Sequence, residues 1–273
     1  MADLLRFLGL QAAYGNYFLV FVLVMCRMTP CVILAPFLGG KSTPNEIKMT
    51  LVMMFTLLAY PFVHRTLSTD VPTEPVAFVM VMLGEIFVGM TIGLVTNHVF
   101  YAIEIMGRII DTARGSNMAE VMVPQMDGRA TPLGDIYYQY AICLIYAIGG
   151  HRIYIDRILM SFEKFPLMKP IAWQGAGFLE YINTFIKMSG DVLLIAIGLA
   201  IPAVATTFVI DVVFGLLNRL APQLNAYFMA MPVKAMGAIV VLFFSLSMIS
   251  SHMEHIFSTM FIDIERVLQF IAG

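Results

Sequence analysis

Charged residues are scarce in this sequence. Only 12% of the 273 residues are Asp, Glu, Lys or Arg, whereas soluble domains average about 25%. The formal net charge is -2 and there is no basic tail or patch, so we do not expect nucleic-acid binding. Hydrophobic residues make up 60% of the chain, which is typical of a membrane protein.

Cysteine is also scarce. Cys26, Cys31 and Cys143 all lie in apolar stretches, which favours buried small side chains over a disulfide framework. We expect no cleavable signal peptide, because the first apolar run begins only at Tyr17 and contains Arg27.

Enzyme signatures are missing from the sequence. It contains neither the G-x-S-x-G pattern of a serine nucleophile nor a phosphate-binding G-x-x-x-x-G-K-[ST] loop. His252 and His255 lack the spacing of a zinc site, so we expect no metal and no cofactor. Asp111 and Asp211 could form the aspartyl dyad of an intramembrane protease only if the fold brought them together. We favour a structural role, in which each of these two carboxylates is paired with neighbours of its own.

The apolar segments predict an all-α, polytopic membrane protein with about six apolar helices, several of them broken. A spanning helix needs about 20 predominantly apolar residues. The candidate segments are 17–38, 47–63, 76–103, 136–149, 190–217 and 233–251. These segments contain Pro30, Pro36, Pro61 and Pro202. Proline removes a backbone hydrogen bond that hydrocarbon cannot replace, so we expect neighbouring protein to compensate.

Lys and Arg are spread almost evenly over the segments between these spans, including a long expected loop at 150–189. The positive-inside rule needs a clear bias and therefore gives no orientation. An even distribution fits helices that are placed by protein partners rather than by the bilayer.

Glu85 lies inside the apolar run VMVMLGEIFVGMTIG. A carboxylate in such a segment is costly in lipid, so it must face protein or water. Gly84, Gly89 and Gly93 let another backbone approach this helix closely. We expect tight packing here on protein partners.

The same argument applies to the other charged residues within apolar segments. We expect Arg27, Glu85, Asp111, Arg114 and Asp211 to be paired or to face water, because unpaired burial of any of them costs several kcal/mol. The sequence leaves the partners open, and they could come from other subunits.

Segment 104–134 combines an alternating charge ladder with turn signals. A break at Gly115-Ser116-Asn117 and turn signals at Pro124 and Asp127-Gly128 delimit a stretch of mostly flexible apolar side chains: Met118, Val121, Met122, Val123 and Met126. One interpretation is an ordinary surface loop. The other is a plug that fills a conduit, because methionine adapts its shape to an irregular gap.

Two further segments connect or end the helices. Residues 218–234 form either a polar helical-hairpin tip or a rim of polar groups that contacts a partner or a passing substrate. The candidate residues are Arg219, Pro222, Gln223, Asn225 and Lys234. The tail 252–273 is predicted to be an amphipathic helix whose apolar positions are Ile256, Met260, Ile264, Val267 and Ile271.

An ordered set of motifs runs along nearly the whole chain. It comprises Arg27 with Pro30 and Pro36, Gly84-Glu85 with Gly89 and Gly93, Gly107, Asp111, Arg114-Gly115, Ala119-Glu120-Val121, Pro124, Thr131-Pro132-Leu133-Gly134, Gly149-Gly150-His151, Ser161, Pro166, Arg219-x-x-Pro-Gln-x-Asn225 and Pro232-x-Lys234-x-x-Gly237. In this set the chain resembles the SctT/FliR family, the T subunits of the bacterial type III secretion export apparatus. The Arg-Gly and Pro-Leu-Gly pieces favour the injectisome branch over the flagellar one, although Thr131 stands where serine is expected.

The resemblance implies a multi-pass subunit of the bacterial inner membrane, within the basal body of the secretion system. Its implied partners are R-type and S-type subunits, the U-type switch subunit and exported unfolded proteins. It also implies an R-like part over 1–189 and an S-like hairpin with its tail over 190–273, together forming one export-apparatus domain. Segment 115–127 would be the channel plug.

A secondary transporter remains the alternative. Transporters also have broken helices and an ionisable residue near the midplane, and Glu85 would fill that role. A transporter should function alone or as a symmetric oligomer. The export subunit should be extracted within a larger complex.

Overall fold

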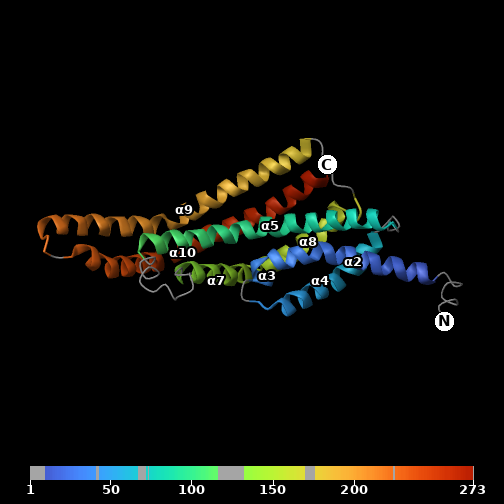
Figure 1. Cartoon of the computed structure of the whole chain (residues 1–273), viewed down its shortest axis with the longest axis horizontal. Helices are drawn as coiled ribbons and strands as arrows, with labels where there is room; N and C mark the ends of the chain where they lie inside the picture. Colours follow the sequence, from blue (N-terminus) through green and yellow to red (C-terminus); the bar gives the residue numbers. More distant parts are fainter. Residues whose placement is uncertain are drawn as a thin grey trace. The chain divides into compact units, whose positions relative to one another are not determined.

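The computed structural model describes residues 10–40, 43–66, 72, 74–115, 132–169, 176–223 and 225–272 (Figure 1). The helices are α2 (Leu10–Leu34), α3 (Pro36–Gly39), α4 (Asn45–Thr66), α5 (Pro75–Ala113), α7 (Pro132–Ala147), α8 (Gly150–Lys164), α9 (Ala176–Leu220) and α10 (Ala226–Ala272). No strand occurs in these ranges, so the all-α prediction is confirmed.

Five of the described helices are long and apolar enough to cross a membrane: α2, α4, α5, α9 and α10. The polytopic membrane class is confirmed, with one spanning candidate fewer than expected. The segment predicted at 136–149 belongs to α7, which has only 16 residues. The expected loop at 150–189 instead contains α8 and the start of α9.

Most prolines of the long apolar helices do not interrupt them. Pro30, Pro61 and Pro202 lie inside continuous helices, as does Pro232. One missing hydrogen bond does not end a long helix when neighbouring groups can satisfy the freed backbone. Pro36 behaves differently, because α2 ends at Leu34 and α3 begins at Pro36, where the absent N–H is not needed.

The chain forms two compact units. The first takes its described residues from 1–97, 149–186 and 259–273, so it contains α2, α3, α4, α8, the first part of α5 and the ends of α9 and α10. Here α2 packs on α3 and α4, and α4 contacts α8. Tyr154 lies in this core, and its hydroxyl donates a 2.8 Å hydrogen bond to the carbonyl of Cys31. Burial raises the pKa of Tyr154 well above 10, so the hydroxyl remains a neutral donor.

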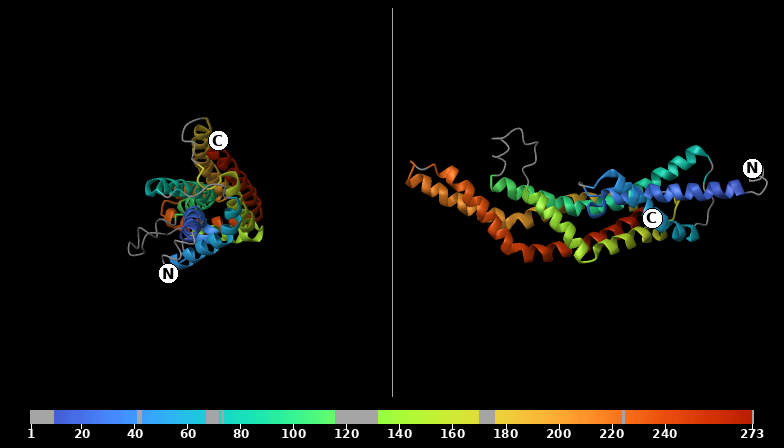
Figure 2. Two further views of the ribbon diagram at one scale, coloured as in Figure 1. Left: turned by 90° about the vertical axis from the view of Figure 1, so that its right-hand side faces the viewer. Right: turned by 90° about the horizontal axis from the view of Figure 1, so that it is seen from below.

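The second unit takes its residues from 98–148 and 187–258. It contains the end of α5, all of α7 and the hairpin of α9 and α10, whose helices run side by side toward their turn (Figures 1 and 2). Phe100 of α5 contacts Phe257 of α10, with ring centroids 5.6 Å apart. Gly107 lies so close to Gly134 that a Cβ on Gly107 would come within 2.1 Å of the Gly134 Cα.

The hairpin and tail differ in extent from the prediction. α9 continues to Leu220 and α10 begins at Ala226, so the connection is shorter than 218–234. The expected tail helix is the end of α10 rather than a separate element. Its amphipathic character is confirmed, because all five predicted apolar positions are buried: Ile256, Met260, Ile264, Val267 and Ile271.

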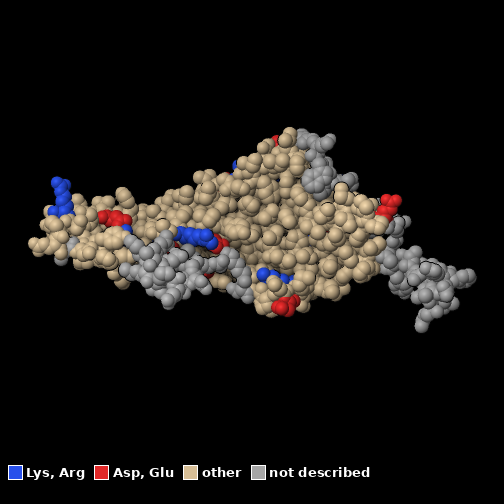
Figure 3. All heavy atoms as spheres, viewed as in Figure 1, with Lys and Arg blue, Asp and Glu red and all other residues tan. Residues whose placement is uncertain are grey.

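Many large apolar side chains remain exposed, especially on α4, α9 and α10. Phe243 and Phe244 are examples, with 73% and 79% of their surface accessible. Charged side chains are correspondingly few on the face drawn in Figure 3. Such surfaces are covered by lipid or by other proteins.

Candidate functional site

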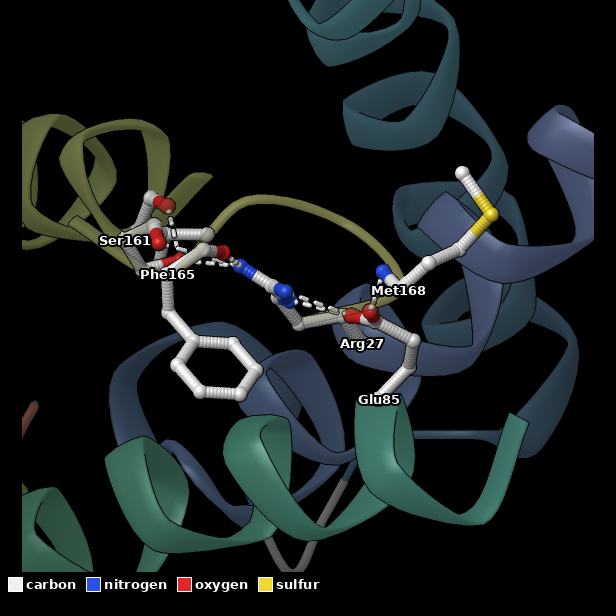
Figure 4. Close-up of polar contacts among 6 residues, drawn as sticks. Arg27, Glu85, Ser161, Phe165 and Met168 are labelled. Atoms are coloured by element: carbon white, nitrogen blue, oxygen red, sulfur yellow. Dashed lines mark hydrogen bonds and ion pairs between the residues drawn. The ribbon is translucent and has the colours of Figure 1, made fainter. Parts of the chain in front are cut away.

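The first candidate cluster lies in the first unit and is centred on Arg27 of α2. Its side chain is fully buried, and Nε and Nη2 both lie 2.6 Å from Oε2 of Glu85 on α5 (Figure 4). The guanidinium also stacks over the ring of Phe162, 4.2 Å from its centroid. Neutralisation of Glu85 by Arg27 within the same chain explains how a carboxylate can occupy this apolar helix.

The end of α8 supplies the remaining partners of this cluster. Nη1 of Arg27 donates to the carbonyl oxygens of Ser161 (3.1 Å) and Phe165 (3.0 Å). The Ser161 carbonyl also accepts the backbone N–H of Phe165 at 2.9 Å, so Arg27 adds a second donor there and a donor to the Phe165 carbonyl at the end of α8. Oε1 of Glu85 accepts a 3.2 Å hydrogen bond from the backbone N–H of Met168, whose φ is 66°. One ion pair therefore fixes α2, α5 and the chain after α8.

Glycines bring α2 and α5 together beside this ion pair. A Cβ on Gly89 would lie 2.1 Å from the carbonyl oxygen of Arg27, and one on Gly93 would lie 2.8 Å from the carbonyl oxygen of Pro30. The expected close approach is therefore made within the chain rather than to a partner subunit. Gly84 is half-buried, and its packing role remains a prediction.

A second cluster lies in the second unit, where α5 ends and α7 begins. Oδ1 of Asp111 lies 2.6 Å from Nη2 of Arg114, and Oδ2 accepts hydrogen bonds from the backbone N–H groups of Leu133 (3.2 Å) and Gly134 (3.4 Å). Asp111 thus caps the N-terminus of α7 from another helix, where the unpaired N–H groups favour a negative charge. The predicted ladder also pairs Glu104 with Arg108 at 2.7 Å.

The predicted plug residues Met118, Val121, Met122, Val123 and Met126 lie outside the described residues. Gly115 is described: it has a φ of 85°, where glycine is favoured, and with Arg114 it forms the turn that ends α5. Asp111 precedes this turn. The two backbone N–H groups that donate to it, those of Leu133 and Gly134, lie just after Pro132. The Asp111 contacts therefore hold together the two chain ends that flank 116–131.

The remaining candidates belong to the hairpin of α9 and α10. Arg219 lies in the last turn of α9, and Pro222, Gln223 and Asn225 are exposed at the connection. Lys234 lies within α10 and forms an ion pair with Asp211 of α9. The roles of these five residues in partner contact remain predictions.

Ser161, Phe165 and Met168 are cluster residues to which the sequence assigned no role. Their backbone groups make most of the contacts, and backbone groups leave no signature in side-chain identity. α8 itself was detectable, because Tyr154, Ile158, Ser161 and Phe162 are buried at helical spacing.

The described part of the chain contains no group of three or more His, Cys, Asp or Glu side chains that could hold a metal ion. Asp111 and Asp211 are each held by a cation of their own, Arg114 and Lys234. Each carboxylate thus has a structural partner within the chain.

The family model for bacterial export proteins, family 1, matches residues 18–260. The chain belongs to this family. Its relatives include the flagellar biosynthetic protein FliR of Bacillus subtilis, 23% identical over 89% of this chain and 92% of the relative. The Yop proteins translocation protein T of Yersinia pestis is 28% identical over 85% of this chain and 88% of the relative. The secretion system apparatus protein SsaT of Salmonella typhimurium is 26% identical over 76% of this chain and 77% of the relative.

Membership of the bacterial export proteins agrees with the resemblance stated from the motifs and with five apolar helices of spanning length. The clusters built on Arg27 and Asp111 lie inside the matched range. The protein is therefore a multi-pass membrane protein of bacterial protein export.

Proposed function

We propose that this protein is a structural and gating subunit of the type III secretion export gate in the bacterial inner membrane. The observation that carries the proposal is the family match over residues 18–260, supported by relatives named for Yop translocation and for a secretion system apparatus. Flagellar relatives match at comparable identity, so the injectisome assignment rests on the Arg-Gly and Pro-Leu-Gly motifs.

The proposed partners are R-type and S-type subunits, the U-type switch subunit and unfolded proteins in transit. The exposed apolar surfaces of α9 and α10 support a role within an assembly. The buried charges of Glu85 and Asp111 are neutralised by residues of the same chain, which fits a structural role.

The proposed plug is segment 115–127. A closed channel must stop ions and yet yield to an unfolded chain, and soft apolar side chains pack a narrow space without strong bonds. The Asp111 contacts to Leu133 and Gly134 support this proposal, because they anchor the base from which the segment departs.

Glu85 distinguishes this proposal from a secondary transporter. A coupling carboxylate must exchange ions or protons during transport. In this chain Oε2 of Glu85 lies against Arg27 and Oε1 accepts the Met168 N–H, both inside the protein. That geometry favours a fixed structural pair.

Gentle detergent extraction from membranes that also contain the other export-apparatus subunits tests the proposal. We expect the protein to elute in one large complex, with other small polytopic subunits identified by mass spectrometry. Elution as a monomer or as a symmetric homo-oligomer would contradict the proposed function and support the transporter.

A further inference from the structure

The last part of α5, which belongs to the second unit, carries polar side chains along one face. Tyr101, Glu104, Arg108 and Thr112 follow one another at intervals of three and four residues, which places them on the same face of the helix. We call these four residues the polar stripe. At a rise of about 1.5 Å per residue the stripe is about 17 Å long.

The opposite face of the same helix packs inside the protein. Phe100, Ile103, Met106 and Ile110 are fully buried there. The polar stripe therefore faces away from the core of the unit. Tyr101 is 47% exposed, and 59% of the Arg108 side chain is accessible.

The stripe is polar but carries no net charge. Glu104 forms an ion pair with Arg108 at 2.7 Å. Tyr138 of α7 lies beside the stripe, and burial, followed by its neighbours Glu104 and Tyr101, raises the pKa of Tyr138 to about 12. Its hydroxyl therefore stays neutral. Such a surface offers both hydrogen-bond donors and acceptors and does not prefer one sign of charge.

Neither lipid nor the membrane surface fits the polar stripe. Acyl chains would leave its ion pair and hydroxyl groups without hydrogen-bond partners. The edge of a bilayer selects polar residues by their depth along a helix, whereas here they are selected by face, because Ile105 and Ile109 of the same turns are apolar and only half-buried. Exposed positions of the hairpin in the same unit, such as Met236 and Phe243, are apolar and suit lipid or other subunits.

The polar stripe leads to the start of the proposed plug. α5 ends at Ala113, directly after Thr112, and Gly115 follows with its φ of 85°. The stripe and the proposed plug are therefore consecutive in the chain, with the stripe on the rigid helix from which the plug segment departs.

We propose that the polar stripe is a contact surface for the exported polypeptide, which passes over it as an unfolded, hydrated chain. An unfolded chain exposes backbone N–H and C=O groups and side chains of both charges. The uncharged stripe can form hydrogen bonds with such a chain without selecting a sequence. This inference rests on the proposed function and names one surface along which the substrate moves.

The first test identifies what touches the stripe. An exported protein of the same system is fused to a tightly folded domain, so that it stalls in the complex. A photo-crosslinking phenylalanine derivative replaces Tyr101 or Arg108, and Phe243 is the control position. The first change keeps an aromatic ring and the second affects an exposed ion pair of little energetic weight, so both variants should assemble. We expect crosslinks to the stalled protein from Tyr101 and Arg108 and none from Phe243.

The second test measures access of water. Cys26 and Cys143 are first replaced by Ala, because they are free and not fully buried. Thr112→Cys and the control Met236→Cys are then treated with a water-soluble maleimide, in membranes made permeable so that the reagent reaches both sides. We expect labelling of Thr112→Cys but not of Met236→Cys, because the reactive thiolate needs water. The stalled protein should protect Thr112→Cys from the reagent.

Three results would overturn the proposal in a complex that assembles and exports. These are crosslinks from Tyr101 and Arg108 to other subunits or lipid alone, a Thr112→Cys thiol that is not labelled, and labelling that the stalled protein leaves unchanged. A wild-type chain that forms no complex, or a complex that exports nothing, would instead contradict the proposed function itself.

Discussion

At the scale of single residues, Arg27 and Glu85 form the structural centre of the first unit. Both side chains are almost completely buried, and their contacts reach α8 through Ser161, Phe165 and Met168. A buried charge that loses its partner is far more costly than the pair itself is favourable. The pair therefore fixes the arrangement of three helices more than it adds net stability.

Replacing one partner of this pair should be more harmful than replacing both. Glu85→Met leaves the buried Arg27 cation unpaired and should cost about 3–5 kcal/mol of unfolding free energy. The double variant Arg27→Met/Glu85→Met should recover part of that loss. Denaturant unfolding of the detergent-purified chain measures both, and equal or additive destabilisation in the double variant would contradict a buried, coupled pair.

Asp111 should act as a cap for α7. Asp111→Leu removes the acceptor for the Leu133 and Gly134 N–H groups, at a cost of about 0.5–2 kcal/mol. Hydrogen exchange measured by mass spectrometry should show faster exchange at the start of α7. Glu104→Gln removes a pair whose Arg108 is 59% exposed and should change exchange little. Unchanged protection in Asp111→Leu would exclude the cap.

At the scale of elements, the glycines of α5 set how closely it approaches α2. Gly89→Ala places a Cβ 2.1 Å from the Arg27 carbonyl oxygen, which is backbone and cannot move aside easily. We expect a loss of about 1–3 kcal/mol or more from overpacking. The control Gly190→Ala on α9 meets no described atom within 4 Å and should be neutral or stabilising. Thermal unfolding of the two purified variants provides the comparison, and similar midpoints would contradict the close contact.

Helices were predictable from the sequence because apolar runs and turn residues are local signals. The end of α5 near Gly115 follows directly from such a signal, and the buried face of the tail helix follows from the spacing of Ile256, Met260 and Ile264. The effect of proline was not predictable in the same way. Whether Pro202 breaks a helix depends on neighbouring groups that the sequence pattern does not locate.

The need for charge pairing was predictable, but the partners were not. Arg27 and Glu85 are 58 positions apart in the chain, and the contact that joins them is formed by the packing of α2 on α5. Asp111 and Arg114 are three positions apart in the predicted charge ladder, and in the structure they form an ion pair. Its second function, accepting the N–H groups of Leu133 and Gly134, requires the tertiary structure.

At the scale of the whole molecule, the chain consists of two compact units joined by the continuous helices α5, α9 and α10. The division into an R-like part at 1–189 and an S-like part at 190–273 concerns relationship to other subunits and remains a prediction. The exposed apolar surface and the family membership agree with a chain that functions inside a larger membrane assembly.

The most direct test of the gating role is the ion conductance of membranes that carry the complex with residues 117–125 deleted. The anchor at Asp111, Leu133 and Gly134 lies outside the deletion, so the complex should still assemble. We predict an assembled complex that leaks small ions, whereas the wild-type complex remains closed. An assembled deletion complex that is as tight as the wild type would show that this segment is not the plug.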